Sequence, residues 1–140
     1  VLTVTQVLDY LRVRLSNKID IRLEQATVSY TVPHNIALME WVIENITKNA
    51  VDAMEGIGTL TVRFEKEGAW IHIELEDTGK GLLPNQFKTI FQPGYSTKKR
   101  GWGLGLSLAK RIIESYHKGK IYVLRSELGK GTTFRISLPL

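Results

Sequence analysis

The hydrophobic residues of this chain change their spacing along the sequence, from the period of a helix to the period of a strand. Between Asn35 and Met54 the apolar residues fall on one arc when they are placed at about 100° per residue. Two pairs of alternating segments follow, over 60–75 and 120–138, and each pair is joined by a turn that contains glycine. Helices and hairpins of this kind bury their apolar faces against each other. The pattern therefore predicts an α+β fold.

Two more helices, two more strands and one long connection complete the expected architecture. Residues 4–15 and 103–117 carry two more helical stripes, and residues 19–24 and 28–32 alternate as strands. We expect a two-layer sandwich in which a mixed, mostly antiparallel sheet packs on three helices. The stretch 77–102 is a long connection rich in glycine and proline, and connections of that length inside a compact domain are usually functional.

The composition excludes several classes of protein. The 140 residues are 43% hydrophobic and 24% charged, which fits one domain with its own core, and there are no cysteines to form disulfides or a thiolate metal site. No apolar run approaches the roughly 20 residues that span a bilayer. The net charge of +5 is spread out except at 98–100, so we expect no nucleic-acid partner. Because the chain begins at Val1 without methionine, we expect a piece of a longer protein.

Asn45 and Asn49 lie one turn apart on the first predicted helix, at the margin of its apolar arc. Asparagine is a poor helix former, so two at this spacing favour a function, although bonds to nearby backbone are the structural alternative. A neutral amide oxygen can ligate Mg²⁺ that already shares phosphate oxygens and waters, without adding negative charge beside them. Asn49 is the better candidate for a metal ligand, and Asn45 is its neighbour.

Asp77 ends an alternating strand and precedes Thr78-Gly79-Lys80-Gly81. Such a sequence also forms an ordinary turn in which the aspartate bonds to its own backbone, so this feature alone leaves both interpretations open. A carboxylate at a strand end can accept a hydrogen bond from the exocyclic amine of a base. The glycines would let the backbone come close to the ring.

A second glycine segment, Gly101-Trp102-Gly103-Leu104-Gly105-Leu106, opens a predicted helix. It lacks the preceding strand of a dinucleotide fingerprint and the Gly-Lys-Ser/Thr end of a P-loop. Glycines at a helix start leave backbone amides that can receive phosphate, and Lys98 and Arg100 lie just upstream. A flexible surface loop is the alternative.

In this order, the segments resemble the ATP-binding catalytic domain of bacterial sensor histidine kinases. That family shares its fold, known as the Bergerat fold, with gyrase, the mismatch-repair ATPase and the large heat-shock chaperone. The resemblance covers residues 35 to 140 and rests on five motifs: an N box at 44–50, a G1 box at 77–81, an F box at 90–98, and two further glycine boxes at 101–106 and 129–134.

The resemblance implies ATP and Mg²⁺ as cofactors and a role for each motif. Asn49 would ligate Mg²⁺, Asn45 would lie beside the phosphates, and Asp77 would bind the adenine amine. Gly79, Gly81 and Thr132 would lie around the base. A lid over the phosphates would be formed by Lys98, Arg100 and the backbone of Gly101, Trp102, Gly103, Leu104, Gly105 and Leu106.

The resemblance also implies transfer of the γ-phosphoryl group to a histidine on a separate helical domain. None of His34, His72 and His117 has the acid and proline spacing of such a phosphoacceptor, so we expect all three to be structural or exposed. Hydrolysing relatives place a glutamate base where this chain has Asn45. Glu44 lies roughly 140° around the helix from Asn49, which favours transfer over hydrolysis.

We therefore expect one domain over 1–140, the catalytic domain of a two-component protein-histidine kinase that does not autophosphorylate alone. Its expected partners are the phosphoacceptor domain of the same protein and, indirectly, a response regulator. We expect a cytoplasmic, monomeric domain of a homodimeric sensor, with phosphoacceptor, sensor and receiver domains outside this chain. Alternatives on the same fold are a serine kinase or anti-sigma regulator, a non-catalytic nucleotide-sensing module, and a hydrolytic ATPase.

Overall fold

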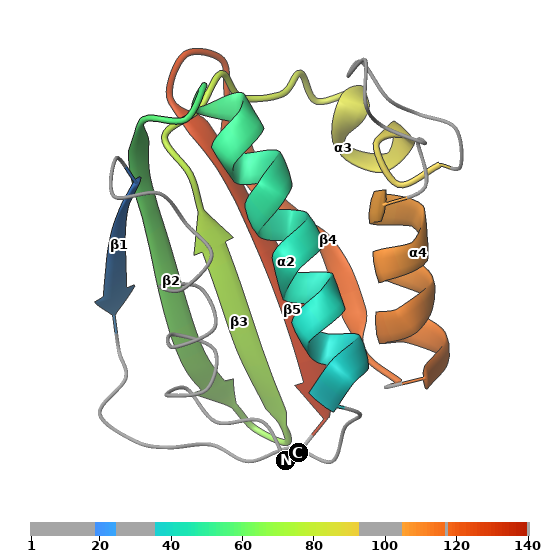
Figure 1. Cartoon of the computed structure of the whole chain (residues 1–140). Helices are drawn as coiled ribbons and strands as arrows, with labels where there is room; N and C mark the ends of the chain where they lie inside the picture. The colour runs from blue at the N-terminus through green and yellow to red at the C-terminus, as the bar shows by residue number, and fades with distance from the viewer. Residues whose placement is uncertain (1–18, 25–35, 93–104, 117, 140) are drawn as a thin grey trace.

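A computed structural model describes residues 19–24, 36–92, 105–116 and 118–139 of the chain. Along the chain these residues form β1 (Ile19–Glu24), α2 (Ile36–Ala53), β2 (Gly58–Glu67), β3 (Trp70–Glu76), α3 (Gln86–Thr89), α4 (Gly105–Arg111), the π-helical turn η1 (Ile112–Tyr116), β4 (Lys120–Glu127) and β5 (Gly131–Pro139). In Figure 1, α2 runs across one face of the sheet and α4 lies beside it. The predicted helix at 4–15 and strand at 28–32 lie outside the described residues.

The sheet has five strands in the order β1-β2-β3-β5-β4. The β1–β2 pair is parallel and the other three pairs are antiparallel, so the prediction of a mixed, mostly antiparallel sheet is confirmed. The last strand of the sequence, β5, lies between β3 and β4 (Figure 1). This order brings Asp77, the residue after β3, next to the first residues of β5. The hydrogen bond from Asp77 N to Thr132 O, at 2.9 Å, joins the two segments.

The core lies between the sheet and the helices, and it follows the two sequence periods. Alternate strand residues point toward α2 and are buried: Leu60, Val62 and Phe64 in β2, Ile71, Ile73 and Leu75 in β3, and Phe134, Ile136 and Leu138 in β5. From α2 the buried stripe is Met39, Val42, Ile43, Ile46 and Ala50. Each fully buried aliphatic side chain contributes roughly 1.5–3 kcal/mol relative to exposure, so this stripe anchors α2 on the sheet.

The structure corrects the first expected turn and adds detail to two other expected segments. The first hairpin turns at Gly68, which has φ of +60°, rather than over 66–68, because β2 continues to pair with β3 as far as Glu67. The long connection contains a one-turn helix, α3, whose Gln86 side chain accepts a hydrogen bond from Leu83 N at 2.9 Å. The last helix changes from α to π geometry after Arg111. Within the described residues, no helix is both long and apolar enough to cross a bilayer.

Candidate functional site

Asp77 is the most constrained polar residue at the end of the sheet. It lies one residue past β3 and is only 3% exposed. Its Oδ1 accepts hydrogen bonds from Gly79 N at 2.9 Å and from Thr132 N at 3.1 Å. No hydrogen bond reaches Oδ2 from any residue that the structure describes. The backbone therefore fixes the carboxylate in one orientation and leaves one oxygen to accept a bond from a ligand.

The surroundings of Asp77 disfavour its charge. Burial raises the pKa of the Asp77 carboxyl above its ordinary value, and the neighbouring Glu76 raises it further. The two backbone N–H groups from Gly79 and Thr132 act in the opposite direction but are outweighed. A buried carboxylate with a raised pKa and one unused oxygen is typical of a binding site, because a ligand donor can supply the missing hydrogen bond.

The glycines after Asp77 allow the loop to pack tightly against the rest of the protein. A Cβ on Gly79 would lie 2.7 Å from the backbone of Ala53 at the end of α2, and Lys80 N donates to Ala53 O at 3.1 Å. Gly81 has φ of +78°, and a Cβ there would lie 2.1 Å from Glu127 O. These glycines therefore permit close packing of the loop on Ala53 and Glu127, in addition to the approach of a ligand ring that the sequence predicts.

The two asparagines of α2 are half-buried, as their place on the helix predicts. Asn45 Nδ2 donates to Trp41 O at 2.8 Å, and Asn49 Nδ2 donates to Asn45 O at 3.0 Å. Because each amide nitrogen is directed at the helix backbone, each amide oxygen is directed away from it. Asn45 Oδ1 faces the start of α4, where it lies 2.9 Å from the position of a Cβ on Gly105. The asparagine edge of α2 and the N-terminus of α4 are therefore adjacent.

The second glycine segment is described only at its end. Gly105 and Leu106 begin α4, and Leu106 packs on the core. The other expected lid residues, Lys98, Arg100, Gly101, Trp102, Gly103 and Leu104, lie outside the described residues. In the part of the chain that is described, no three histidine, cysteine or acidic side chains gather as a metal site.

Ser126, which lies outside every predicted motif, connects the segments around Asp77. Its Oγ accepts from Leu82 N at 2.7 Å, donates to Gly131 O at 3.0 Å, and lies 2.7 Å from Thr132 Oγ1. Thr132 is 5% exposed. A serine within an alternating strand has no distinguishing sequence pattern, so this connection is visible only in the folded chain.

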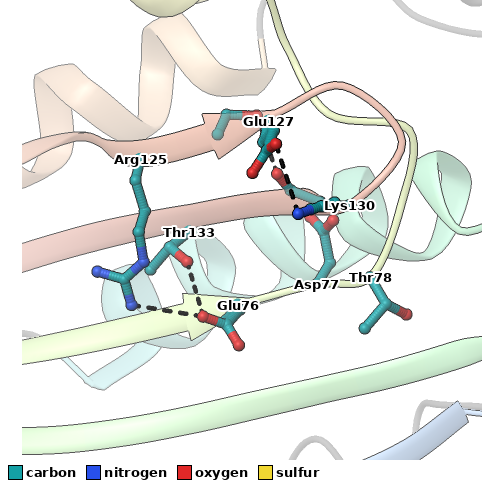
Figure 2. Close-up of a pocket in the computed structure, with 9 residues that line it drawn as sticks. Glu76, Asp77, Thr78, Arg125, Glu127, Lys130 and Thr133 are labelled. Carbon is teal, nitrogen blue, oxygen red and sulfur yellow. Dashed lines mark hydrogen bonds and ion pairs between the residues drawn. The ribbon is translucent and has the colours of Figure 1, made fainter.

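A hollow of about 310 Å³ lies at the same end of the sheet, and its charged walls belong to the face opposite α2. Glu76 lies beside Arg125 (3.4 Å) and Thr133 (3.2 Å), while Lys130 lies 3.5 Å from Glu127 (Figure 2). These charges neutralise one another, and the hollow is lined by Asp77 and Ser126 but by neither asparagine of α2. We place the candidate site on the α2 side of the sheet, because Thr132, which bonds to Asp77, alternates with the inward-facing Phe134, and because Asn45 of α2 faces Gly105.

His72 and Glu44 lie outside the residues that form this site. His72 is buried, with Nδ1 2.7 Å from Ser137 Oγ and Nε2 3.1 Å from Glu67 Oε1, so its role is structural as expected. His34 and His117 lie outside the described residues. Glu44 forms an ion pair with Lys48 at 3.6 Å, one turn along α2.

Comparisons with known proteins agree with this arrangement. The sequence profile described as "Histidine kinase-, DNA gyrase B-, and HSP90-like ATPase" matches residues 34–140. Sporulation kinase C of Bacillus subtilis (strain 168) is 38% identical over 102 residues, which cover 73% of this chain and 23% of that protein. Sensor histidine kinase ZraS of Escherichia coli (strain K12) is 39% identical over 99 residues, which cover 71% and 21%. This chain therefore spans about a fifth of the length of these relatives.

A solved structure shows the same fold. The mycobacterial sensor histidine kinase MprB superposes with a TM-score of 0.83 over 99% of this chain and 95% of that one, at 22% sequence identity. At this identity the likeness concerns the fold, and it confirms the predicted two-layer α+β architecture.

Proposed function

Because the chain belongs to the histidine kinase-, DNA gyrase B-, and HSP90-like ATPase family, we propose that it is the ATP-binding catalytic domain of a protein-histidine kinase. It binds Mg-ATP and donates the γ-phosphoryl group to a histidine on a separate helical domain. The observation that carries this proposal is the buried Asp77 carboxylate, which the backbone orients and which keeps one oxygen for a ligand donor. The names of two relatives, Sporulation kinase C and Sensor histidine kinase ZraS, also support the proposal.

The base would lie against Asp77. Oδ2 accepts a hydrogen bond from the exocyclic amine of adenine, which relieves the cost of the buried charge. Thr132 lies beside the same carboxylate, because its backbone N–H donates to Oδ1. The loop through Gly79 and Gly81 would form the adjoining wall.

Mg²⁺ and the phosphates would lie along the α2 edge. The donor set fits this ion, because an amide oxygen ligates Mg²⁺ without adding charge, and Mg²⁺ keeps most of its remaining ligands as water and phosphate oxygen. Asn49 supplies the protein ligand, and Asn45 faces the phosphates together with the start of α4. When bound, Mg²⁺ neutralises negative charge on the phosphates. As the sequence resemblance implies, Lys98, Arg100 and the backbone amides from Gly101 to Leu106 would bind the phosphates.

Transfer is favoured over hydrolysis by what surrounds the γ-phosphate. Asn45 occupies the place of a hydrolytic glutamate and has no basic group to activate water. Glu44 is held by Lys48 on α2. Phosphoryl transfer requires mainly position and charge neutralisation, so an incoming imidazole can accept the group without a strong base in this domain. In the full protein we expect a homodimer that passes the phosphoryl group on to a response regulator.

Calorimetric titration of the chain with Mg-ATP tests the site. Asn49→Ala and Asp77→Asn should each weaken binding by about tenfold or more, since each removes a charged or metal-linked contact. Asn85→Ala is the matched control, because Asn85 is exposed and its side chain makes no capping bond to α3. Unchanged affinity in both site variants would refute the assignment.

The reaction itself is tested with a helical phosphoacceptor domain from a sensor kinase. We expect phosphate to appear on that domain in an acid-labile form, as phosphohistidine, and only when ATP and this chain are both present. Acid-stable phosphate on a serine-bearing partner would instead support the serine kinase alternative. Steady release of phosphate by the chain alone would support a hydrolytic ATPase.

A further inference from the structure

We propose that Ser126 is a positioning residue that sets the base specificity of the site by orienting the hydroxyl group of Thr132. This inference rests on the proposed ATP site and adds to it a residue that lies in none of the five motifs.

A β-bulge brings Ser126 to its place. In β4, Val123 pairs with Phe134 of β5, but Arg125 pairs with Thr133, so the register shifts by one residue at this point. As a result Ser126 lies directly opposite Thr132. Without the bulge, Ser126 would be opposite Gly131 and its side chain would face the other side of the sheet.

The hydrogen bonds of Ser126 use its full capacity. A serine hydroxyl has one proton and can accept two bonds. Leu82 N can only donate to it, at 2.7 Å, and Gly131 O can only accept from it, at 3.0 Å. The remaining contact, 2.7 Å from Thr132 Oγ1, must therefore be a bond that Thr132 donates.

This bond fixes the direction of the Thr132 proton. Thr132 Oγ1 has no other hydrogen-bond partner among the described residues, so its acceptor positions remain for a ligand. The backbone N–H of Thr132 is already used by Asp77 Oδ1. Asp77 Oδ2 and Thr132 Oγ1 are then both acceptors, and neither residue offers a spare donor.

Two acceptors select an amine. The 6-amino group of adenine carries two N–H donors, which can reach these acceptors directly or through one water. In guanine and hypoxanthine the 6-oxo group is itself an acceptor, and the N1–H beside it can pair with only one of the two protein acceptors, so the other would stay unpaired. Ser126 is thus required for discrimination against 6-oxo nucleotides, although it does not touch the base.

The test is the ratio of affinities of the chain for ATP and for inosine triphosphate, which has an oxo group in place of the amine. Ser126→Ala frees the Thr132 hydroxyl to rotate and donate, so we expect the ratio to fall by about tenfold, from weaker ATP binding and stronger inosine triphosphate binding. Ser126→Thr keeps a hydroxyl and should retain the ratio. Ser137→Ala is the matched control, because it removes a buried serine hydroxyl with a 2.7 Å contact to His72 on the opposite face of the sheet.

A Ser126→Ala variant that weakens both nucleotides equally would overturn the inference and reduce Ser126 to a structural role. If this variant does not fold, Ser126→Cys supplies the same comparison, because a thiol is a poor hydrogen-bond partner. Failure of the proposed function gives a different result. In that case the unaltered chain would bind neither nucleotide, or Asp77→Asn would leave ATP affinity unchanged.

Discussion

Asp77 lowers the free energy of unfolding at neutral pH, because its carboxylate is charged and buried in the folded chain. Its pKa is raised in the fold, so between the ordinary carboxyl pKa and the raised value the folded chain binds more protons than the unfolded chain. The free energy of unfolding therefore falls as pH rises through this window, and the full cost is present above it. Below the ordinary carboxyl pKa the cost disappears.

Asp77→Asn should remove this cost while weakening ATP binding. An asparagine Oδ1 can still accept from Gly79 N and Thr132 N, so the turn is preserved. We expect the variant to be at least as stable as the unaltered chain at pH 7, with the difference vanishing toward low pH. Urea denaturation of both proteins across pH measures this. Lower stability of the variant at every pH would contradict the assignment of the raised pKa.

Gly131 is a residue whose side chain cannot be enlarged. It has φ of +132°, and a Cβ there would lie 2.0 Å from Asp77 O, whereas Gly129 in the same turn has φ of +79° and open space around it. Gly129→Ala should cost about 1–2 kcal/mol from backbone strain alone. Gly131→Ala should cost more than about 3 kcal/mol, because the backbone of Asp77 must also move. Equal losses in denaturant unfolding would show that the contact with Asp77 O is unimportant.

At the scale of elements, the open face of the sheet is held by an ion cluster. Glu74 of β3 is 5% exposed and lies under Arg135 of β5, which approaches it at 2.6 Å and 3.0 Å. Arg63 of β2 lies 3.9 Å from the same carboxylate. The cluster therefore joins three neighbouring strands on the side that no described helix covers.

Removal of this carboxylate should strongly destabilise the sheet. Glu74→Ala removes the buried carboxylate that Arg135 approaches at 2.6 Å and leaves this partly buried arginine with a 4.0 Å contact to Glu65, while Arg63 keeps its bonds to Glu76. We expect a loss of about 3–5 kcal/mol in the free energy of unfolding. Arg22→Ala breaks an exposed pair with Asp20 and should cost less than about 1 kcal/mol. A similar small loss for both variants in urea denaturation would mean that the cluster is effectively solvated.

The elements themselves were largely predictable, because each depends on a local period. The first long helix was expected over 35–54 and is observed over Ile36–Ala53, and the inward faces of β2, β3 and β5 match the expected alternation. The ion cluster and the Ser126 contacts were not predictable. Glu74 alternates with apolar residues like any solvated residue, and Ser126 faces Thr132 only because of a bulge that depends on pairing between distant strands.

At the scale of the whole molecule, the candidate site exists only in the folded chain. Asp77 and Thr132 are 55 residues apart in sequence and meet through the pairing of β3 with β5. The motif residues could be identified from the sequence because their types are chemically specific. The contact of Asp77 with Thr132 and of Asn45 with Gly105 could not be derived from spacing alone, since the first requires the strand order and the second the position of α2.

This dependence on the fold predicts that the ligand stabilises the molecule. Mg-ATP at a hundred times its dissociation constant should raise the free energy of unfolding by about 2.7 kcal/mol, because the unfolded chain has no site. Under the same conditions Asp77→Asn should gain much less, and Asn85→Ala should gain as much as the unaltered chain. Thermal unfolding with and without nucleotide measures this. Equal stabilisation of all three proteins would place the nucleotide away from Asp77.

The most direct measurement is a crystal structure of the chain with Mg²⁺ and a non-hydrolysable ATP analogue. The adenine amine should lie about 3 Å from Asp77 Oδ2, with the ion on the amide oxygen of Asn49 and the phosphates at the start of α4. A base against Glu76 and Arg125 on the opposite face of the sheet, or at any place where its amine does not reach Asp77 Oδ2, would contradict the proposed site.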